Sequence, residues 1–419
     1  MSGATSLQEV FGIADHVNEY SYVDRGGLDA QLRYALDARR HIAIHGASKQ
    51  GKTWLRARLL DKDATVLVQC QTGMTTESIF IDALGDLGVR AEIRRTSGSD
   101  FEGTLDFQGS GSIGLHLLGR LGIEARAGAR GGRSTSTESQ LIGRTPANLQ
   151  WVARTILASR KRLIVEDCHY LDSRCLQDLA FIMKALGGYD LHILIAGIWP
   201  QDHLLTFHNG DLGGRVEDIH LTWKDVELDA VLQAGSKALN IQMSDSLKNM
   251  LVADAAGNVG LLQELAEATC REEKVLLRPA RSRYLTPGPP LDRARSVVAN
   301  NMRPRFQAFA ENFDGAVQDV LRGIREPLLI LRAIMDRSDE ELLQGIGRRP
   351  LSHKMNELTG GQLSAGKVDN FLAAVDEIHA AMGIQPPVLS YNQHLNKLYL
   401  ADQSLLFFRK YGSPKWPWR

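Results

Sequence analysis

The chain has 419 residues, 43% of them hydrophobic and 23% charged, which is typical of a globular protein with two or three domains. The 49 basic residues balance the 49 acidic residues, so net charge argues neither for nor against a nucleic-acid partner. The four cysteines form no CxxC pair, which argues against a zinc site and suits a reducing cytosol. No apolar run has the length of a membrane span and the first ten residues lack a signal-peptide pattern, so we expect a cytoplasmic protein without membrane contact.

The first predicted elements surround a glycine-rich loop. Leu28, Leu32 and Leu36 recur at helical spacing, and the alternating run 41–45 predicts a strand. The loop that follows reads Gly-Ala-Ser-Lys-Gln-Gly-Lys-Thr over 46–53, and the next residues favour a helix. Strand, glycine loop and helix form the setting of a phosphate-binding P-loop, or Walker A motif.

The chemistry of phosphate binding explains this pattern of residues. Its glycines let successive backbone N–H groups point at phosphate oxygens, beside the positive end of the following helix. Lys52 can reach the β- and γ-phosphates, and the Thr53 hydroxyl can ligate Mg²⁺. The sequence therefore predicts ATP and Mg²⁺ as cofactors. The expected nucleotide-binding residues are Gly46, Ala47, Ser48, Lys49, Gln50, Gly51, Lys52, Thr53 and Trp54.

Alternating strands and helices predict a parallel sheet sandwiched by helices. A strand over 64–70 and a helix over 76–87 continue the pattern. A Gly-, Ser- and Arg-rich insertion over 92–145 then interrupts it, and its alternating apolar residues from Ile113 to Ile123 predict a β-hairpin. The insertion is either a surface excursion or a hairpin that self-associates or contacts a phosphate backbone or an acidic partner through its arginines.

A second diagnostic stretch is the apolar strand that ends in Glu166 and Asp167. Paired carboxylates after a buried strand form a Walker B motif, in which one holds the Mg²⁺ shell and the other orients the attacking water. Chain order assigns Glu166, with Thr53, to Mg²⁺ and Asp167 to the water, although the two roles can be exchanged.

The next strand, over 191–197, is followed by no polar residue that could sense the γ-phosphate. Arg215 precedes a short strand and is either an arginine that stabilises phosphoryl charge or an ordinary surface residue.

The remaining sequence is mostly helical. Three helices over 223–277 predict a lid on an ATPase core of residues 1–222, and a Pro-rich stretch over 278–290 predicts a linker. Residues 291–419 predict several helices and a hairpin around 392–396, an arrangement similar to a winged helix. The aromatic and basic end of the chain is either packed on this domain or a docking tail.

Several of these stretches resemble AAA+-like ATPases of the STAND and ORC/Cdc6 type. Val23-Asp24-Arg25 before a Leu-rich helix resembles their "vGR-E-L" opening, and Glu166-Asp167-Cys168-His169-Tyr170-Leu171-Asp172 is similar to their "ED-x-H-W-x-D" motif. Gly213-Gly214-Arg215 resembles an arginine box, and the turn 257–261 resembles the turn into the lid, without its sensor arginine. The resemblance implies ATP binding, slow hydrolysis and nucleotide-controlled assembly.

These observations predict an ATP-binding and slowly hydrolysing molecular switch. We expect a homo-oligomer that acts on an effector or partner protein in bacterial defence or signalling, by analogy with STAND-like ATPases. The alternative is a DNA-binding ATPase of the origin-recognition or transposition-regulator type.

Overall fold

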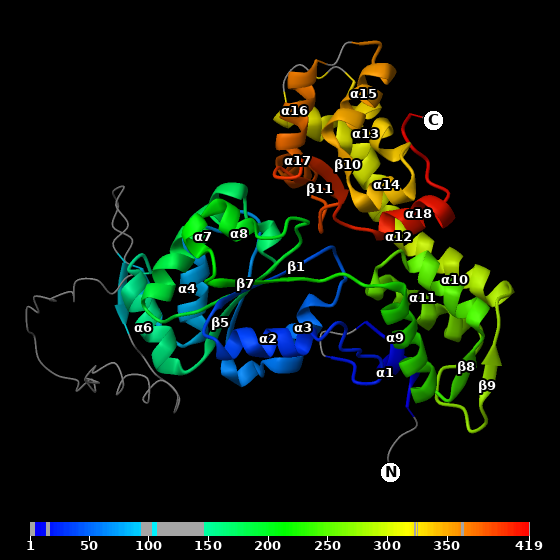
Figure 1. The fold of residues 1–419 in the computed structure, drawn as a ribbon, viewed down its shortest axis with the longest axis horizontal. Helices are drawn as coiled ribbons and strands as arrows, with labels where there is room; N and C mark the ends of the chain where they lie inside the picture. Colours follow the sequence, from blue (N-terminus) through cyan, green and yellow to red (C-terminus); the bar gives the residue numbers. More distant parts are fainter. Residues whose placement is uncertain are drawn as a thin grey trace, which may run out of the picture.

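The computed structural model describes residues 5–13, 17–93, 103–106, 146–321, 324, 326–361 and 364–418. Its largest sheet has five parallel strands, all of which have their carboxyl ends at one edge (Figure 1). In spatial order they are β2 (Thr65–Gln69), β5 (Arg162–Glu166), β6 (Leu194–Ala196), β1 (His41–His45) and β7 (Val216–His220). The strand that carries Glu166 is therefore separated from the P-loop strand by β6.

Helices cover both faces of this sheet, because β1 sends alternate side chains to opposite sides. Ile42 and Ile44 pack with the face covered by α2 (Leu28–Asp37) and α3 (Lys52–Leu59). Ala43 belongs to the opposite face, which α4, α6 and α7 cover. These three helices span Thr76–Asp86, Leu149–Ser159 and Ser173–Gly188, and short α8 spans Leu204–His208. The predicted α/β P-loop fold class is confirmed.

The predicted insertion is described only at its start. β3 (Arg90–Ile93) pairs antiparallel with β4 (Gly103–Asp106). The apolar residues 113–123 and the arginines on which the hairpin prediction was based lie outside the described residues, so that prediction stays untested.

The lid helices are α9 (Asp225–Ala238), α10 (Asp245–Ala255) and α11 (Val259–Glu272). They share one apolar core with the N-terminal helix α1 (Leu7–Phe11), which lies beside α9 in Figure 1. The Pro-rich stretch after them is ordered rather than a simple linker. Its strand β9 (Arg283–Leu285) pairs in parallel with β8 (Ile241–Met243), because backbone pairing overrides the local Pro and Gly signals.

One long helix, α12 (Pro289–Val320), joins the lid to the last part of the chain. Of the several helices predicted after residue 290, the first is a single helix over 289–320 that contains Pro304. Its first half packs in the lid core and its second half in the C-terminal core, and Met302 contacts both. The boundary between the two cores therefore lies inside α12, not in the stretch 278–290.

The C-terminal core combines helices with a small sheet of order β10–β12–β11, whose pairs are antiparallel. The predicted hairpin around 392–396 is present as β11 (Leu389–Asn392) and β12 (Lys397–Leu400), and Trp416 of the tail packs into the core. The other elements are α13 (Pro327–Met335), α14 (Asp339–Gln344), β10 (Ile346–Gly347), α15 (Arg348–Leu358), α16 (Ala365–Ala373), α17 (Val375–Met382) and α18 (Ser404–Tyr411). Among the described helices, none is both long and apolar enough to cross a membrane.

Candidate nucleotide site

The P-loop turns sharply at the carboxyl end of β1. Gly46 has φ 138° and Gly51 has φ 86°, a backbone region that favours glycine. A Cβ on Gly46 would lie 2.5 Å from the carbonyl oxygen of Leu221, so a larger residue could not keep this turn. The two glycines of the motif are thus required by local geometry.

Lys52 begins α3 and lies across the loop. Its Nζ donates hydrogen bonds to the carbonyl oxygens of Gly46 (3.2 Å) and Ala47 (2.7 Å). Burial lowers the pKa of Lys52 to about 8, and the nearby carboxylate of Asp167 partly offsets this shift. The ammonium group is therefore held at the centre of the loop, in a place where an anion would stabilise its charged form.

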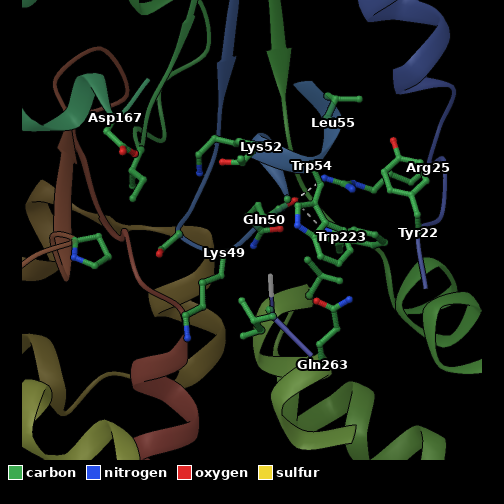
Figure 2. Close-up of a pocket in the computed structure, with 18 of the residues that line it drawn as sticks. Tyr22, Arg25, Lys49, Gln50, Lys52, Trp54, Leu55, Asp167, Trp223 and Gln263 are labelled. Atoms are coloured by element: carbon green, nitrogen blue, oxygen red, sulfur yellow. Dashed lines mark hydrogen bonds between the residues drawn. The ribbon is translucent and has the colours of Figure 1, made fainter. Parts of the chain in front are cut away.

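A cavity of about 380 Å³ opens beside the loop, within the size range of small-molecule sites (Figure 2). Residues 48–54 line one side of it, while Gly46 and Ala47 do not reach it. The opposite wall comes from the N-terminal segment and the lid, and is largely apolar. Its members include Ile13, Tyr22, Val23, Trp223, Val259 and Gln263. A polar phosphate end beside an apolar wall suits a nucleotide with a planar base.

Arg25 and Trp223 together hold the peptide carbonyl of Gln50 (Figure 2). Arg25 Nη2 donates to this oxygen at 2.7 Å and Trp223 Nε1 donates to it at 3.1 Å. The guanidinium also lies 3.8 Å from the centre of the Trp223 ring, a cation–π contact. No functional role was predicted for Trp223, because nothing in its local pattern indicates that it meets the P-loop.

The two Walker B carboxylates have different surroundings. Glu166 is buried, and Arg56 of α3 contacts its Oε1 with Nε and Nη2, both at 3.0 Å. Asp167 has a left-handed backbone, φ 59°, and lines the cavity. Burial raises the pKa of both carboxyls, against the pull of Arg56 on Glu166 and of Lys52 on Asp167. Only Asp167 of the pair lines the nucleotide cavity. This lining alone does not decide which carboxylate ligates Mg²⁺ and which orients the water, so both assignments stay open.

His169 is a further polar group at this cavity. Neither ring nitrogen has a hydrogen-bond partner among the described residues, although both are buried. Burial and the charge of Lys52 lower the pKa of His169 to about 3, so the ring is neutral at physiological pH. Buried polar atoms without partners are uncommon, and a bound ligand is one way to satisfy them.

The structure separates Arg215 from the other predicted site residues. Arg215 is exposed and immediately precedes β7. It therefore lies at the amino ends of the parallel strands, whereas the P-loop lies at their carboxyl ends. The five residue-to-residue steps from Arg215 to His220 span about 16 Å at the rise of a strand. At the P-loop edge, the residue after β6 that lines the cavity is the apolar Ile198.

Comparison with known proteins agrees with this geometry. Residues 35–198 match the AAA domain family. Residues 35–198 are therefore an AAA-type P-loop ATPase domain. This match covers less than half of the chain, and none of the curated protein sequences matches it.

Solved structures show where the fold recurs. The Walker-type ATPase PABY2304 of Pyrococcus abyssi superposes with a TM-score of 0.54 at 14% identity, covering 96% of this chain and 99% of that one. The Aeropyrum pernix ORC1 protein in complex with DNA gives 0.42 at 10% identity, with 97% and 96% covered, and the Thermotoga maritima RuvB branch-migration motor gives 0.39 at 10%, with 95% and 98% covered. Only the first is similar enough to support the fold, and at these identities none assigns a biological role.

Proposed function

We propose that this AAA+ ATPase is a slowly hydrolysing switch, in which the P-loop reports its nucleotide state to the C-terminal core. The observation that supports this most is a direct contact between the two. Ser48 N–H donates to the carbonyl oxygen of Ala401 at 2.9 Å, and Gln50 Nε2 donates to Gln403 Oε1 at 3.1 Å. Ala401 follows β12 and Gln403 precedes α18, so both residues belong to the C-terminal core.

The lid contacts the same loop. Gly260 N–H donates to the carbonyl oxygen of Lys49 at 3.1 Å, and Gln50 Nε2 also donates to the carbonyl oxygen of Gly257 at 2.9 Å. A Cβ on Gly260 would lie 2.7 Å from that of Lys49, so the helix start approaches the loop closely. A change in loop conformation would therefore alter contacts with both the lid and the C-terminal core.

In this proposal, the P-loop amides and Lys52 bind the phosphates of ATP. Thr53 and Glu166 hold Mg²⁺, which would neutralise charge on the phosphates. Both contacts of Arg56 with Glu166 are made to Oε1. In this proposal the other carboxylate oxygen, Oε2, ligates the ion. Asp167 orients the attacking water from its place in the cavity. The apolar Ile198, where a polar sensor could stand, accords with slow turnover.

In this proposal Arg215 acts across a subunit boundary, because it precedes β7 at the amino ends of the strands and the P-loop follows β1 at their carboxyl ends. We predict that Arg215→Ala lowers turnover in an assembled homo-oligomer by roughly tenfold or more, since a finger arginine is worth about 10³ or above in well-studied cases. Turnover per chain should be compared across protein concentrations. An equal loss in chains shown by light scattering to be monomeric would contradict a role between subunits.

The coupling has a direct test in the side chain of Gln403. Gln403→Ala removes one of the hydrogen bonds that position Gln50, so we expect ATP to bind about three- to tenfold more weakly, the loss of about one hydrogen bond. Titration calorimetry measures the change. Gln318→Ala is the matched control, because Gln318 contacts Asp314 on an exposed face of α12. An unchanged dissociation constant for ATP in Gln403→Ala would argue against the coupling.

For the biological process, we propose bacterial defence or signalling, with output to an effector protein in the cytoplasm. This rests on analogy with STAND-like switches. The test is co-purification from the native host with and without ATP: a partner that binds the wild-type chain in an ATP-dependent manner and does not bind Lys52→Ala supports it. A chain that captures no partner in either state argues against it.

A second candidate is a DNA-binding ATPase. The specific observation is the C-terminal sheet order β10–β12–β11 with helices between β10 and β11, which is compatible with a winged helix, and Arg348 and Arg349 line a hollow beside the turn residue Asn396. Filter binding to duplex DNA across a salt series tests it. Affinity that requires ATP and falls steeply with salt supports DNA binding, and no binding at low salt excludes it.

A further inference from the structure

A cluster of histidine and aspartate side chains lies beside the P-loop but outside the nucleotide cavity. His45 ends β1 and His220 ends β7, and the two residues are paired in register. Asp202 comes from the segment after β6. None of the three lines the nucleotide cavity, and the proposed ATPase does not use them.

The donor atoms of these residues converge. Within the described part of the chain, His45, Asp202 and His220 are three residues whose ligand atoms all lie within 4.8 Å of one another. His220 Nδ1 lies 2.7 Å from Asp202 Oδ1, and His45 Nε2 lies 3.7 Å from the same oxygen. Two ligands of a tetrahedral zinc ion, each at about 2.05 Å, are separated by roughly 3.3 Å. The first separation is about 0.6 Å shorter than this value and the second about 0.4 Å longer, so the donors must move by about these amounts to share one ion.

A fourth residue, Asp218, borders this cluster without being one of its converging donors. Asp218 of β7 lies with Oδ2 3.0 Å from His45 Nε2, and this oxygen also accepts a hydrogen bond from the His203 N–H at 2.9 Å. The Asp218 side chain is only 7% exposed, so its carboxylate faces inward rather than into solvent. The two imidazoles and one carboxylate that do converge, from His45, His220 and Asp202, form a ligand set that zinc and similar divalent ions accept, with a further position for water.

The contacts of His45 itself point to a cation. Its side chain is fully buried, and Nδ1 lies 3.2 Å from the carbonyl oxygen of Trp199, which can only accept, so Nδ1 carries the hydrogen. Nε2 then faces the carboxylate oxygens of Asp218 and Asp202, which are also acceptors. In a neutral ring, the lone pair on Nε2 would face and repel the lone pairs of these carboxylate oxygens. Either a second proton or a metal ion must lie between them.

A metal ion on Nε2 accounts for the contact of Nδ1 with the Trp199 carbonyl as well as a second proton does. Metal-bound histidines usually donate their other N–H to a backbone carbonyl or a carboxylate, which fixes the ring and its tautomer. His45 already has this arrangement. Two donors, His220 and Asp202, are partly exposed, which gives an ion a route to the site.

We propose that His45, Asp202 and His220, with the Asp218 carboxylate beside them, form a binding site for one divalent transition-metal ion of the zinc class. The ion would tie the segment after β6 to the ends of β1 and β7. His45 directly precedes Gly46, and its carbonyl oxygen accepts a hydrogen bond from the Leu221 N–H at 2.8 Å. The site would thus fix the base from which the P-loop departs.

The experiment titrates the full chain, purified without metal and with no nucleotide present, with Co²⁺ and then displaces it with Zn²⁺. We expect one equivalent to bind with the visible absorption of a tetrahedral cobalt centre, and Zn²⁺ to raise the melting temperature. His220→Gln and Asp202→Asn change partly exposed residues and should each weaken binding at least tenfold. His394→Gln and Asp211→Asn, at exposed positions outside the cluster, should bind as the wild type does.

Two results would overturn the proposal. One is the absence of saturable Co²⁺ and Zn²⁺ binding in the wild-type chain. The other is one equivalent that His220→Gln and Asp202→Asn both retain with unchanged affinity. Circular dichroism of each variant confirms that a loss of binding does not reflect unfolding.

Discussion

Lys52→Ala is expected to weaken ATP binding by on the order of 100-fold, which corresponds to about 3 kcal/mol and to the loss of charge-assisted hydrogen bonds to phosphate. Lys52 Nζ lies across the P-loop on the carbonyl oxygens of Gly46 and Ala47, so its removal takes away a cation already held where the phosphates would lie. Titration with ATP measures the loss. Lys184→Ala, a change to an exposed lysine paired with Asp211, is the control.

The pKa of Lys52 also predicts that ATP affinity depends on pH. The pKa of Lys52 is about 8, and a bound phosphate raises it by favouring the charged form. ATP affinity should therefore be constant well below pH 8 and should fall as pH rises above 8, by up to tenfold per unit until the pKa of the complex is reached. Lys52→Arg stays charged over this range and should lose the slope. ATP affinity unchanged in Lys52→Ala would contradict the assignment of the P-loop.

Asp167→Asn is expected to lower turnover by about 10² to 10⁴, the usual contribution of a positioned acid–base group, while ATP still binds within a few-fold of the wild type. The amide keeps the size of the carboxylate but cannot accept a proton or orient water in the same way. Single-turnover measurement of ADP formation separates this step from binding.

The companion variant Glu166→Gln separates the two carboxylates. It disrupts the buried ion pair with Arg56, so we expect a lower melting temperature as well as a weaker dependence on Mg²⁺. If Asp167→Asn instead shifts the Mg²⁺ dependence and Glu166→Gln does not, the two roles are exchanged. Wild-type turnover in Asp167→Asn would remove it from the mechanism altogether.

Local pattern was enough to predict the ATPase core. Four strands of the five-stranded sheet are short runs rich in apolar residues, β7 with its Glu217 and Asp218 being the exception, and parallel order follows from their alternation with helices. Gly46 and Gly51 have a backbone conformation that other residues rarely adopt. This is why the loop could be recognised from its residue pattern alone. Asp172 and Thr75 also cap α7 and α4 through their side chains, as their residue types indicate.

Features formed by distant segments could not be predicted in this way. Nothing near Trp223 or Ala401 in the sequence indicates that both meet the P-loop, because such contacts depend on how separate elements pack. Composition suggested a linker at 278–290, yet the two cores divide within α12 near Met302. The donors of the proposed metal site come from β1, β7 and the segment after β6, with no spacing that a motif would reveal.

The central claim, that the P-loop passes its nucleotide state to the C-terminal core, is tested most directly by hydrogen exchange of the full chain with and without ATP. Because the Ser48 amide bonds to Ala401 and Gln50 bonds to Gln403, ATP should change exchange in peptides covering 386–411 as well as in the loop. Lys52→Ala should show neither change. A response confined to the P-loop and Walker B peptides, with 386–411 unaffected at saturating ATP, would contradict the account.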